Sequence, residues 1–213
     1  MATVIYLVRH GQSMGNLNRR FLGHTDLDLS PLGYQQAAAL KKYLDDITFD
    51  AIYSSPLLRA YHTIEGLAKE RKQGVVTSQE LMEIYAGAWE NLTFSDLEAK
   101  YPLQYSCFRR DIGMSRPEEG ESTLEVGKRV HGYLEGVACA HEGEQILVST
   151  HATAICMFVC EVLGLAPEER KRIALPTNAS LTILEYRDGR FILKSYSQDA
   201  YLGELKTPTP PLA

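Results

Sequence analysis

The stretch "LVRHGQS" at residues 7–13 places Arg9 and His10 side by side, after an apolar run and before a glycine. Three more side chains of interest follow other apolar segments, namely Arg59, Glu83 and His151. Guanidinium and imidazolium groups bind phosphate dianions, and a neutral imidazole is a competent nucleophile near neutral pH. A carboxylic acid can protonate a leaving alkoxide. Together these residue types predict a phosphoryl-transfer site whose fixed positive charges replace a metal ion.

These side chains meet only if the elements before them end at one sheet edge. Short β-branched runs predict strands over 3–8, 49–55, 74–78 and 145–151, and amphipathic runs predict helices over 29–47, 55–71 and 122–140 and another after 151. Strands alternating with helices predict an α/β fold, a three-layer α/β/α sandwich with a largely parallel central sheet. Such sheets bind ligands at the carboxyl ends of their strands.

Local signals support several of these elements. Ser30 is the expected N-cap of the helix over 29–47, and Ser55 that of the helix over 55–71. Ser122 with Glu125 forms a capping box for the helix over 122–140. Residues 180–196 alternate around "RDGR", which predicts an antiparallel hairpin at the sheet edge and a candidate surface for a homodimer.

Composition limits the class of protein. The chain has 213 residues, 45% of them hydrophobic, so we expect one domain over 1–205, followed by a proline-rich tail over 206–213 that is loose or disordered. A net charge of -5 argues against general nucleic-acid binding. No apolar run approaches about 20 residues, so we expect a cytoplasmic protein without a membrane partner. Cys156 and Cys160 lie in an apolar helix pattern, which predicts buried thiols rather than a metal or redox pair.

The two histidines have different expected roles. His10 is the better nucleophile, because Gly11 lets the backbone bend close to a phosphate. His151 precedes a helix and is better placed to stabilise charge. Glu83 is the candidate proton donor, provided that its surroundings keep the carboxyl group protonated.

The order of these motifs resembles that of the histidine phosphatase superfamily, in its phosphoglycerate mutase-like branch 1, and in particular the small phosphatases. The matching segments extend over roughly residues 4–160. They are "LVRHGQSMGNLNRRFLGHTDLDLSPLGYQQA", "SSPLLRAYHTIE", "LMEIYAGAWENLT", "RPEEGES" and "LVSTHATAI". The resemblance implies a phosphoglycerate mutase-like fold, a small phosphorylated metabolite as substrate, and neither a metal nor another cofactor.

The resemblance also assigns roles to residues. His10 is similar to the phosphorylated nucleophile, and Glu83 to the proton donor. Arg9, Arg59 and His151 are similar to the rest of the phosphate pocket. Positions that contact phosphate or substrate in the family correspond to Gly11, Asn16, Leu22, Gly23 and Ala152.

Departures from the family pattern favour hydrolysis. After "WENLT" the chain lacks the longer insertion with which mutases clasp the substrate, so we expect a phosphomonoesterase of the histidine acid phosphatase type. A cofactor-dependent phosphoglycerate mutase remains the alternative, because Arg109, Arg110 and Arg116 could hold a second anionic group. A third reading is a silent phospho-ligand binding module. Asp28 replaces a frequent proline without a consequence that the sequence reveals.

Three aromatic residues near the second motif have an open role. They line the substrate entrance or pack in the core, and they are Tyr85, Trp89 and Tyr101. The four remaining histidines have no motif position and are expected to be structural or surface residues; they are His24, His62, His131 and His141.

Overall fold

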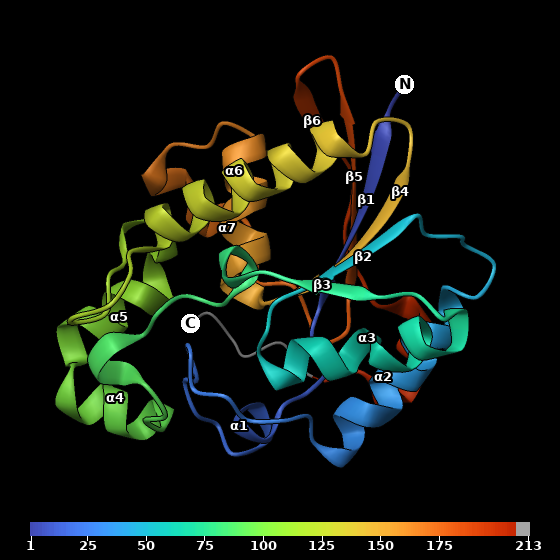
Figure 1. The fold of residues 1–213 in the computed structure, drawn as a ribbon. Helices are drawn as coiled ribbons and strands as arrows, with labels where there is room; N and C mark the ends of the chain where they lie inside the picture. Colours follow the sequence, from blue (N-terminus) through green and yellow to red (C-terminus); the bar gives the residue numbers. More distant parts are fainter. Residues whose placement is uncertain (208–213) are drawn as a thin grey trace.

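One six-stranded sheet organises the protein in this computed structural model, which describes residues 1–207 (Figure 1). The end of the predicted tail, 208–213, lies outside the described residues. The strand order is β3-β2-β4-β1-β5-β6. The strands are β1 (Thr3–Arg9), β2 (Ala51–Ser54), β3 (Val75–Thr77), β4 (Gln145–Thr150), β5 (Leu181–Arg187) and β6 (Arg190–Gln198).

The sheet is largely parallel, as the sequence predicts. β1, β4, β2 and β3 pair in parallel, whereas β5 pairs antiparallel with β1 and β6 antiparallel with β5. The β5–β6 hairpin turns at Asp188 and Gly189, both with positive φ, and β6 is an edge strand. This agrees with the expectation from "RDGR", since two residues of positive φ form the tight turn that suits hairpin twist.

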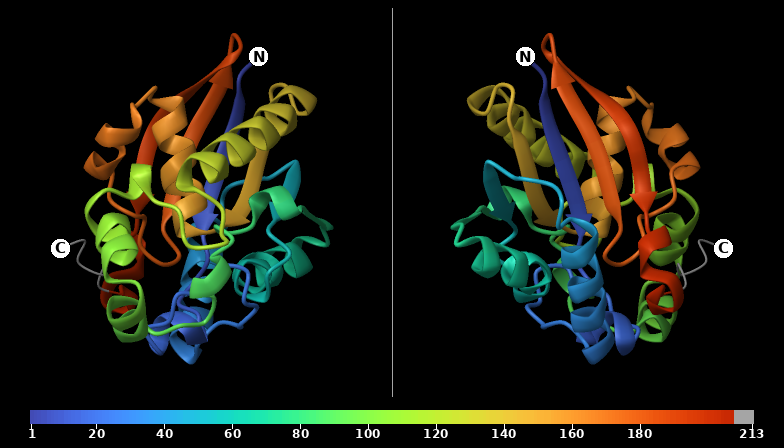
Figure 2. Two further views of the ribbon diagram at one scale, coloured as in Figure 1. Left: turned by 90° about the vertical axis from the view of Figure 1, so that its left-hand side faces the viewer. Right: turned by 90° about the vertical axis from the view of Figure 1, so that its right-hand side faces the viewer.

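Helices cover both faces of the sheet and complete the three layers (Figures 1 and 2). They are α1 (Met14–Leu17), α2 (Pro31–Tyr43), α3 (Leu58–Arg71), α4 (Phe94–Lys100), α5 (Pro102–Arg110), α6 (Thr123–Ala140) and α7 (Ala152–Val162). On one face α2 and α3 bury residues such as Leu40 and Ile64 against Val8. On the other face α6 and α7 bury residues such as Val130 and Phe158 against Leu7. No helix within residues 1–207 is long and apolar enough to cross a membrane.

A third apolar cluster lies beside the sheet rather than on it, around α4 and α5. Trp89 is fully buried there and contacts Tyr105 and Phe108 edge to face. The cluster also takes in Cys156 and Cys160 of α7, both fully buried, as the sequence predicts. The sequence patterns predicted no helix or strand between residues 90 and 120, so α4 and α5 were not expected.

Two helix boundaries differ from the prediction for clear reasons. The predicted helix over 29–47 ends at Tyr43, just before Asp45 and Asp46, whose negative charges are unfavourable at a helix C-terminus. The predicted cap Ser55 lies three residues before α3, which begins at Leu58 without a side-chain cap. Ser55 is followed by Pro56, which disfavours helical backbone at Ser55.

Gly11 and Gly33 permit a close approach between the loop after β1 and the first turn of α2. A Cβ atom on Gly33 would lie 2.1 Å from the carbonyl oxygen of Gln12, and one on Gly11 would lie 2.7 Å from that of Gly33. Gly11 does not have a positive φ. The sequence-based reason for this glycine, a tight backbone bend, is therefore replaced by close packing against α2.

This packing predicts opposite effects for two glycine substitutions. Gly33→Ala is expected to lower the free energy of unfolding by about 1–3 kcal/mol, because its methyl group meets backbone that cannot rotate away. Gly66→Ala, in α3 with nothing within 4 Å of the added Cβ, is expected to raise it by roughly 0.5–1 kcal/mol. Urea unfolding of both variants measures the two values, and a neutral Gly33→Ala variant would contradict the close approach.

Candidate active site

A cavity of about 270 Å³ opens at the carboxyl ends of the parallel strands. Five arginines and two glutamates line it, so its charge is positive although the whole chain is negative. Its charged lining residues are Arg9, Arg19, Arg20, Arg59, Arg109, Glu83 and Glu98. The expected site residues that also line it are His10, Asn16, Leu22, Gly23 and Ala152.

His10 leaves β1 with its backbone held on two sides. Its N–H donates to the carbonyl of Thr150 on β4, and its own carbonyl accepts from the N–H of Ala179 and the Nδ2 of Asn178. The residue is only 4% exposed. Backbone motion is therefore restricted at the candidate nucleophile.

The His10 imidazole has a defined tautomer. Its Nδ1 lies 2.6 Å from the carbonyl oxygen of Gly11, which can only accept, so Nδ1 carries the proton. Nε2 therefore keeps its lone pair, and it is not among the buried atoms that are closed off without a partner. Burial, followed by the charges of Arg59 and Arg9, lowers the pKa of His10 well below its usual range. A neutral ring with a free Nε2 borders the cavity.

The two inner arginines are buried and have no ion-pair partner within residues 1–207. Arg9 donates to the carbonyl of Pro176, and Arg59 to those of Gly23 and Thr25, at 2.6–2.9 Å. Burial lowers the pKa of each to about 10, an effect that the charge of Glu83 partly opposes. Both remain cationic near neutral pH. The Nε of Arg9 is buried with no hydrogen-bond partner within residues 1–207, as expected for a group that awaits an anion.

His151 lies beside His10, with ring centroids 5.1 Å apart. Its Nε2 is 2.8 Å from Ser55 Oγ, and in the described part of the chain its Nδ1 has no partner. Burial, and then the charge of Arg59, lowers the pKa of His151 well below its usual range. The side chain is fully buried and does not line the cavity directly. Ser55 Oγ thus contacts His151 and also accepts from the N–H of Leu57, just before α3, at 3.3 Å.

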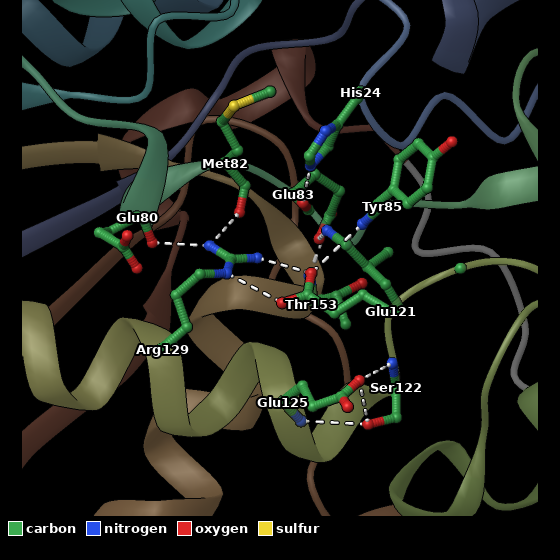
Figure 3. A network of polar contacts seen from close by, with 12 residues as sticks. His24, Glu80, Met82, Glu83, Tyr85, Glu121, Ser122, Glu125, Arg129 and Thr153 are labelled. Atoms are coloured by element: carbon green, nitrogen blue, oxygen red, sulfur yellow. Dashed lines mark hydrogen bonds and ion pairs between the residues drawn. The ribbon is translucent and has the colours of Figure 1, made fainter.

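The carboxylate of Glu83 is held by backbone N–H groups on both oxygens. Ile84 N–H donates to Oε1 at 2.9 Å, and Thr153 N–H, in the first turn of α7, donates to Oε2 at 3.2 Å. The Nε2 of His24 is 3.0 Å from the carbonyl of Glu83, and it donates because a carbonyl only accepts (Figure 3). His24 therefore fixes the backbone of Glu83, a contact that no sequence pattern indicated.

Gly11 differs from the other expected contact residues. Its N–H donates to Thr63 Oγ1 at 3.0 Å, and it does not line the cavity, so the structure describes only a packing role for it. Its contact with phosphate stays a prediction. Asn16 does line the cavity. Its Oδ1 accepts from Ser13 N–H and from Asn178 Nδ2, which leaves its own Nδ2 free of those contacts. Ala152 begins α7, where helix N–H groups attract anions.

Glu90 holds the loop that supplies Gly23. Its Oε1 accepts from the N–H groups of His24 and Ala86, and its Oε2 from Thr25, all at 2.5–3.0 Å. Gly23 has a φ of +51°, and a Cβ there would lie 2.1 Å from Glu90 Oε1. No role was predicted for Glu90, which lies within the motif "WENL", or for Asn178. Both are polar residues in short motifs between elements, which is the one signal that could have found them.

Asp28, the departure from the family pattern, has a partner. Its Oδ1 is 2.7 Å from Nδ1 of His62, and its Oδ2 accepts from the hydroxyl of Tyr34 at 2.9 Å. The hydrogen bond from His62 lowers the pKa of Asp28, against the effect of its partial burial. The pair joins the site loop to α3, one turn after Arg59.

The outer part of the cavity is aromatic and basic. Its apolar lining residues are Phe21, Leu22, Phe94, Tyr105, Phe108 and Leu175. Tyr85, Trp89 and Tyr101 do not line it, and Trp89 packs in the core instead. Three arginines were predicted as candidates to hold a second anionic group of the substrate. Of these, Arg109 lines the cavity, whereas Arg110 does not. Arg116 binds Glu125 and the carbonyl of Gly120, away from the cavity.

An α/β sandwich with an arginine-rich cavity at its strand ends is suited to bind anions, and comparisons with known proteins identify its family. A family model described as the histidine phosphatase superfamily (branch 1) matches residues 5–199. The chain therefore belongs to the histidine phosphatase superfamily, which confirms the family and the fold expected from the motifs.

Relatives in this superfamily include phosphatases and mutases. Phosphoserine phosphatase 1 of Hydrogenobacter thermophilus is 30% identical over 200 residues, which cover 94% of both chains. A probable phosphoglycerate mutase, GpmB, of Yersinia pestis is 28% identical and covers 90% of this chain and 89% of its own. The solved structure of Bacillus stearothermophilus YhfR has a TM-score of 0.90 at 27% identity, covering 94% and 99%. Longer mycobacterial relatives are 33% identical, and this chain spans 55% of their length.

The lowered pKa values of both site histidines predict an unusual titration. His10 is expected to stay neutral and protonated on Nδ1 from pH 7 to pH 5 in long-range ¹H–¹⁵N spectra. In the unfolded chain both rings take up protons near pH ~6.5, so the free energy of unfolding should fall as pH drops below that value. An ordinary midpoint near ~6.5 for His10, or a proton on Nε2, would contradict the geometry.

Proposed function

We propose that this chain is a metal-independent phosphomonoesterase that hydrolyses small phosphorylated metabolites through a phosphohistidine intermediate on His10. The observation that carries this proposal is the neutral His10 ring, whose Nδ1–H is bound to Gly11 and whose Nε2 is free beside two buried arginines. A histidine that only bound phosphate would gain from being charged. One that attacks phosphorus must be neutral.

The first step transfers the phosphoryl group to the enzyme. Nε2 of His10 forms a bond to phosphorus while the bond to the ester oxygen breaks, and Glu83 gives its proton to the departing alkoxide. Arg9 and Arg59 stabilise the charge on the phosphoryl oxygens. Ser55 is placed to donate to Nε2 of His151, and His151 supports the His10 ring beside it, because it does not itself line the cavity.

The second step returns the phosphoryl group to water. A water molecule attacks phosphorus, the nitrogen–phosphorus bond breaks, and the Glu83 carboxylate takes the proton of the water. Relatives named as mutases transfer the group to a second alcohol instead. Hydrolysis is favoured here because the chain between Thr93 and Pro102 forms only the short helix α4, without an insertion that would cover the cavity.

The outer cavity favours substrates with a second anionic group. Arg19, Arg20 and Arg109 line it, and none of them forms an ion pair within the described residues. Arg109 lies over the ring of Tyr105 at 5.9 Å. An unpaired guanidinium is suited to a carboxylate or a second phosphate. O-phosphoserine and 3-phosphoglycerate have this chemistry.

Phosphorus NMR in the presence of EDTA tests the proposed function. The panel contains O-phosphoserine, 3-phosphoglycerate with a trace of 2,3-bisphosphoglycerate, glycerol phosphate and 4-nitrophenyl phosphate. We expect inorganic phosphate to appear, fastest from substrates with a second anion. Interconversion of 3- and 2-phosphoglycerate without phosphate release would instead make the protein a mutase. Binding without any turnover would support a silent phospho-ligand module.

Glu83→Gln is expected to slow hydrolysis by an amount that depends on the leaving group of the substrate. Hydrolysis of alkyl phosphates should slow by about 10²–10⁴-fold, because their alkoxides cannot depart without a proton. Hydrolysis of 4-nitrophenyl phosphate should slow far less, since nitrophenolate leaves unaided. Steady-state kcat/KM on both substrates is the measurement, and equal losses on the two would remove Glu83 as proton donor.

Arg109→Met is expected to weaken recognition of the second anion only. KM for 3-phosphoglycerate should rise about tenfold or more, as for loss of a charge-assisted hydrogen bond, while KM for glycerol phosphate stays within twofold. Arg110→Met is the matched control, because it removes the neighbouring charge outside the cavity. A similar change of KM in both variants would show that only the general positive field matters.

A further inference from the structure

A partly buried ion pair between Glu121 of the "RPEEGES" segment and Arg129 of α6 binds the backbone of the segment that carries Glu83. Nε and the second terminal nitrogen of Arg129 donate to both carboxylate oxygens of Glu121, at 2.9 and 2.8 Å. The remaining terminal nitrogen donates to the carbonyls of Glu80 and Met82, at 2.7 and 3.2 Å. The two side chains are 19% and 18% exposed. Figure 3 shows this guanidinium between Glu121 and the Glu80–Met82 backbone.

Glu121 binds the backbone on the C-terminal side of Glu83. Its N–H donates to the carbonyl of Tyr85 at 2.9 Å, and its Oε2 accepts from the N–H of Tyr85 at 3.3 Å. Gly120 also lies against the carbonyl of Tyr85, where an added Cβ would be 2.6 Å away. The backbone is thus tied to one ion pair just before and two residues after Glu83.

The segment that this ion pair contacts, residues 80–85, has little regular secondary structure. After the single 3-10 turn over Gln79–Leu81, the chain has no helix or strand until Gly87. Its carbonyl groups therefore need donors from elsewhere. The carboxyl group of Glu83 must nevertheless stay fixed relative to His10, because a proton donor acts only within hydrogen-bonding distance of the leaving oxygen.

We propose that Arg129 and Glu121 are positioning residues for Glu83, which hold its carboxyl group where the leaving oxygen of the substrate departs. This inference rests on the proposed function, in which Glu83 is the proton donor. Neither residue lines the cavity, and neither touches the reacting atoms. The pair acts through backbone, so its loss should affect the step that needs the proton and leave attack by His10 intact.

The same region contains an ion pair that lacks this geometry. Arg116 and Glu125 pair at 2.6 Å, but both are more than half exposed and neither contacts residues 80–85. An exposed pair of that kind contributes little to stability. The Arg129–Glu121 pair is distinguished by its burial, its two parallel hydrogen bonds and its contacts with the Glu83 segment.

The test compares leaving groups in Arg129→Met. We expect kcat/KM, which reports phosphoryl transfer to His10, to fall about 10- to 100-fold for an alkyl phosphate, the loss typical of a misplaced reacting group, and less than threefold for 4-nitrophenyl phosphate. Arg129→Lys, which keeps the charge but has a single donor nitrogen in place of the planar fork, should recover part of the loss. Glu121→Gln, which keeps the shape of the side chain, should show a smaller loss of the same kind and decides the matter if Arg129→Met does not fold.

Arg170→Met is the matched control for lost stability. Arg170 pairs with Glu161 at 2.6 Å and is similarly buried, but it does not contact the Glu83 segment. It should lower the melting temperature without changing the ratio of alkyl to aryl rates. A change of that ratio as large as in Arg129→Met would overturn the proposal, and so would equal losses on both substrates in Arg129→Met.

A double mutant separates this inference from the proposed function. In a Glu83→Gln background, Arg129→Met should cost nothing further on alkyl phosphates, because the group that it positions is gone. A further alkyl-specific loss would overturn the positioning role while Glu83 remained the proton donor. If Glu83→Gln itself lost both substrates equally, the proton-donor assignment would fall, and this inference with it.

Discussion

The burial of two guanidinium groups beside a neutral imidazole is the constraint on which the rest of the structure depends. Arg9 and Arg59 are 8% and 1% exposed, and in the described part of the chain neither has a carboxylate partner. Removing such charges from water is costly, and three backbone carbonyls from two separate segments offset only part of that cost. Burial, and then the charges of Arg59 and Arg9, lowers the pKa of His10. In the proposed function a phosphate dianion compensates the buried positive charge, so phosphate affinity and a neutral nucleophile share one physical origin.

The loops around the site exist to hold this arrangement in place. Three carboxylates do so without lining the inner pocket: Glu90 fixes the Gly23 loop, Asp28 joins that loop to α3, and Glu121 works with Arg129 on the Glu83 segment. Each takes backbone or side-chain donors that would otherwise be unsatisfied. The sheet alone brings the strand ends together, but the strands determine side-chain positions only up to those ends. These contacts extend the rigidity of the sheet into the loops.

The sequence predicted the features that depend on hydrophobic periodicity and on the order of motifs along the chain. Alternation of strands and helices predicted the parallel sheet, and "RDGR" predicted the edge hairpin, because both are local patterns. Positions after strand ends predicted that His10, Arg59 and Glu83 lie around one cavity. Contacts between loops distant in sequence were not predictable in this way. The partners of Asn178, Glu90 and Arg129 are fixed only when the chain has folded, and α4 and α5 were missed because their apolar residues pack sideways against Trp89 rather than on the sheet.

Trapping the phosphoenzyme tests the central claim most directly. The protein is mixed with substrate in EDTA and quenched at alkaline pH, and the modified residue is identified by mass spectrometry and phosphorus NMR. Because Nδ1 of His10 is bound to the carbonyl of Gly11, we expect a single acid-labile phosphohistidine on Nε2 of His10, absent from His10→Ala. A phosphoryl group on Nδ1, on another residue, or on no residue during turnover would contradict it.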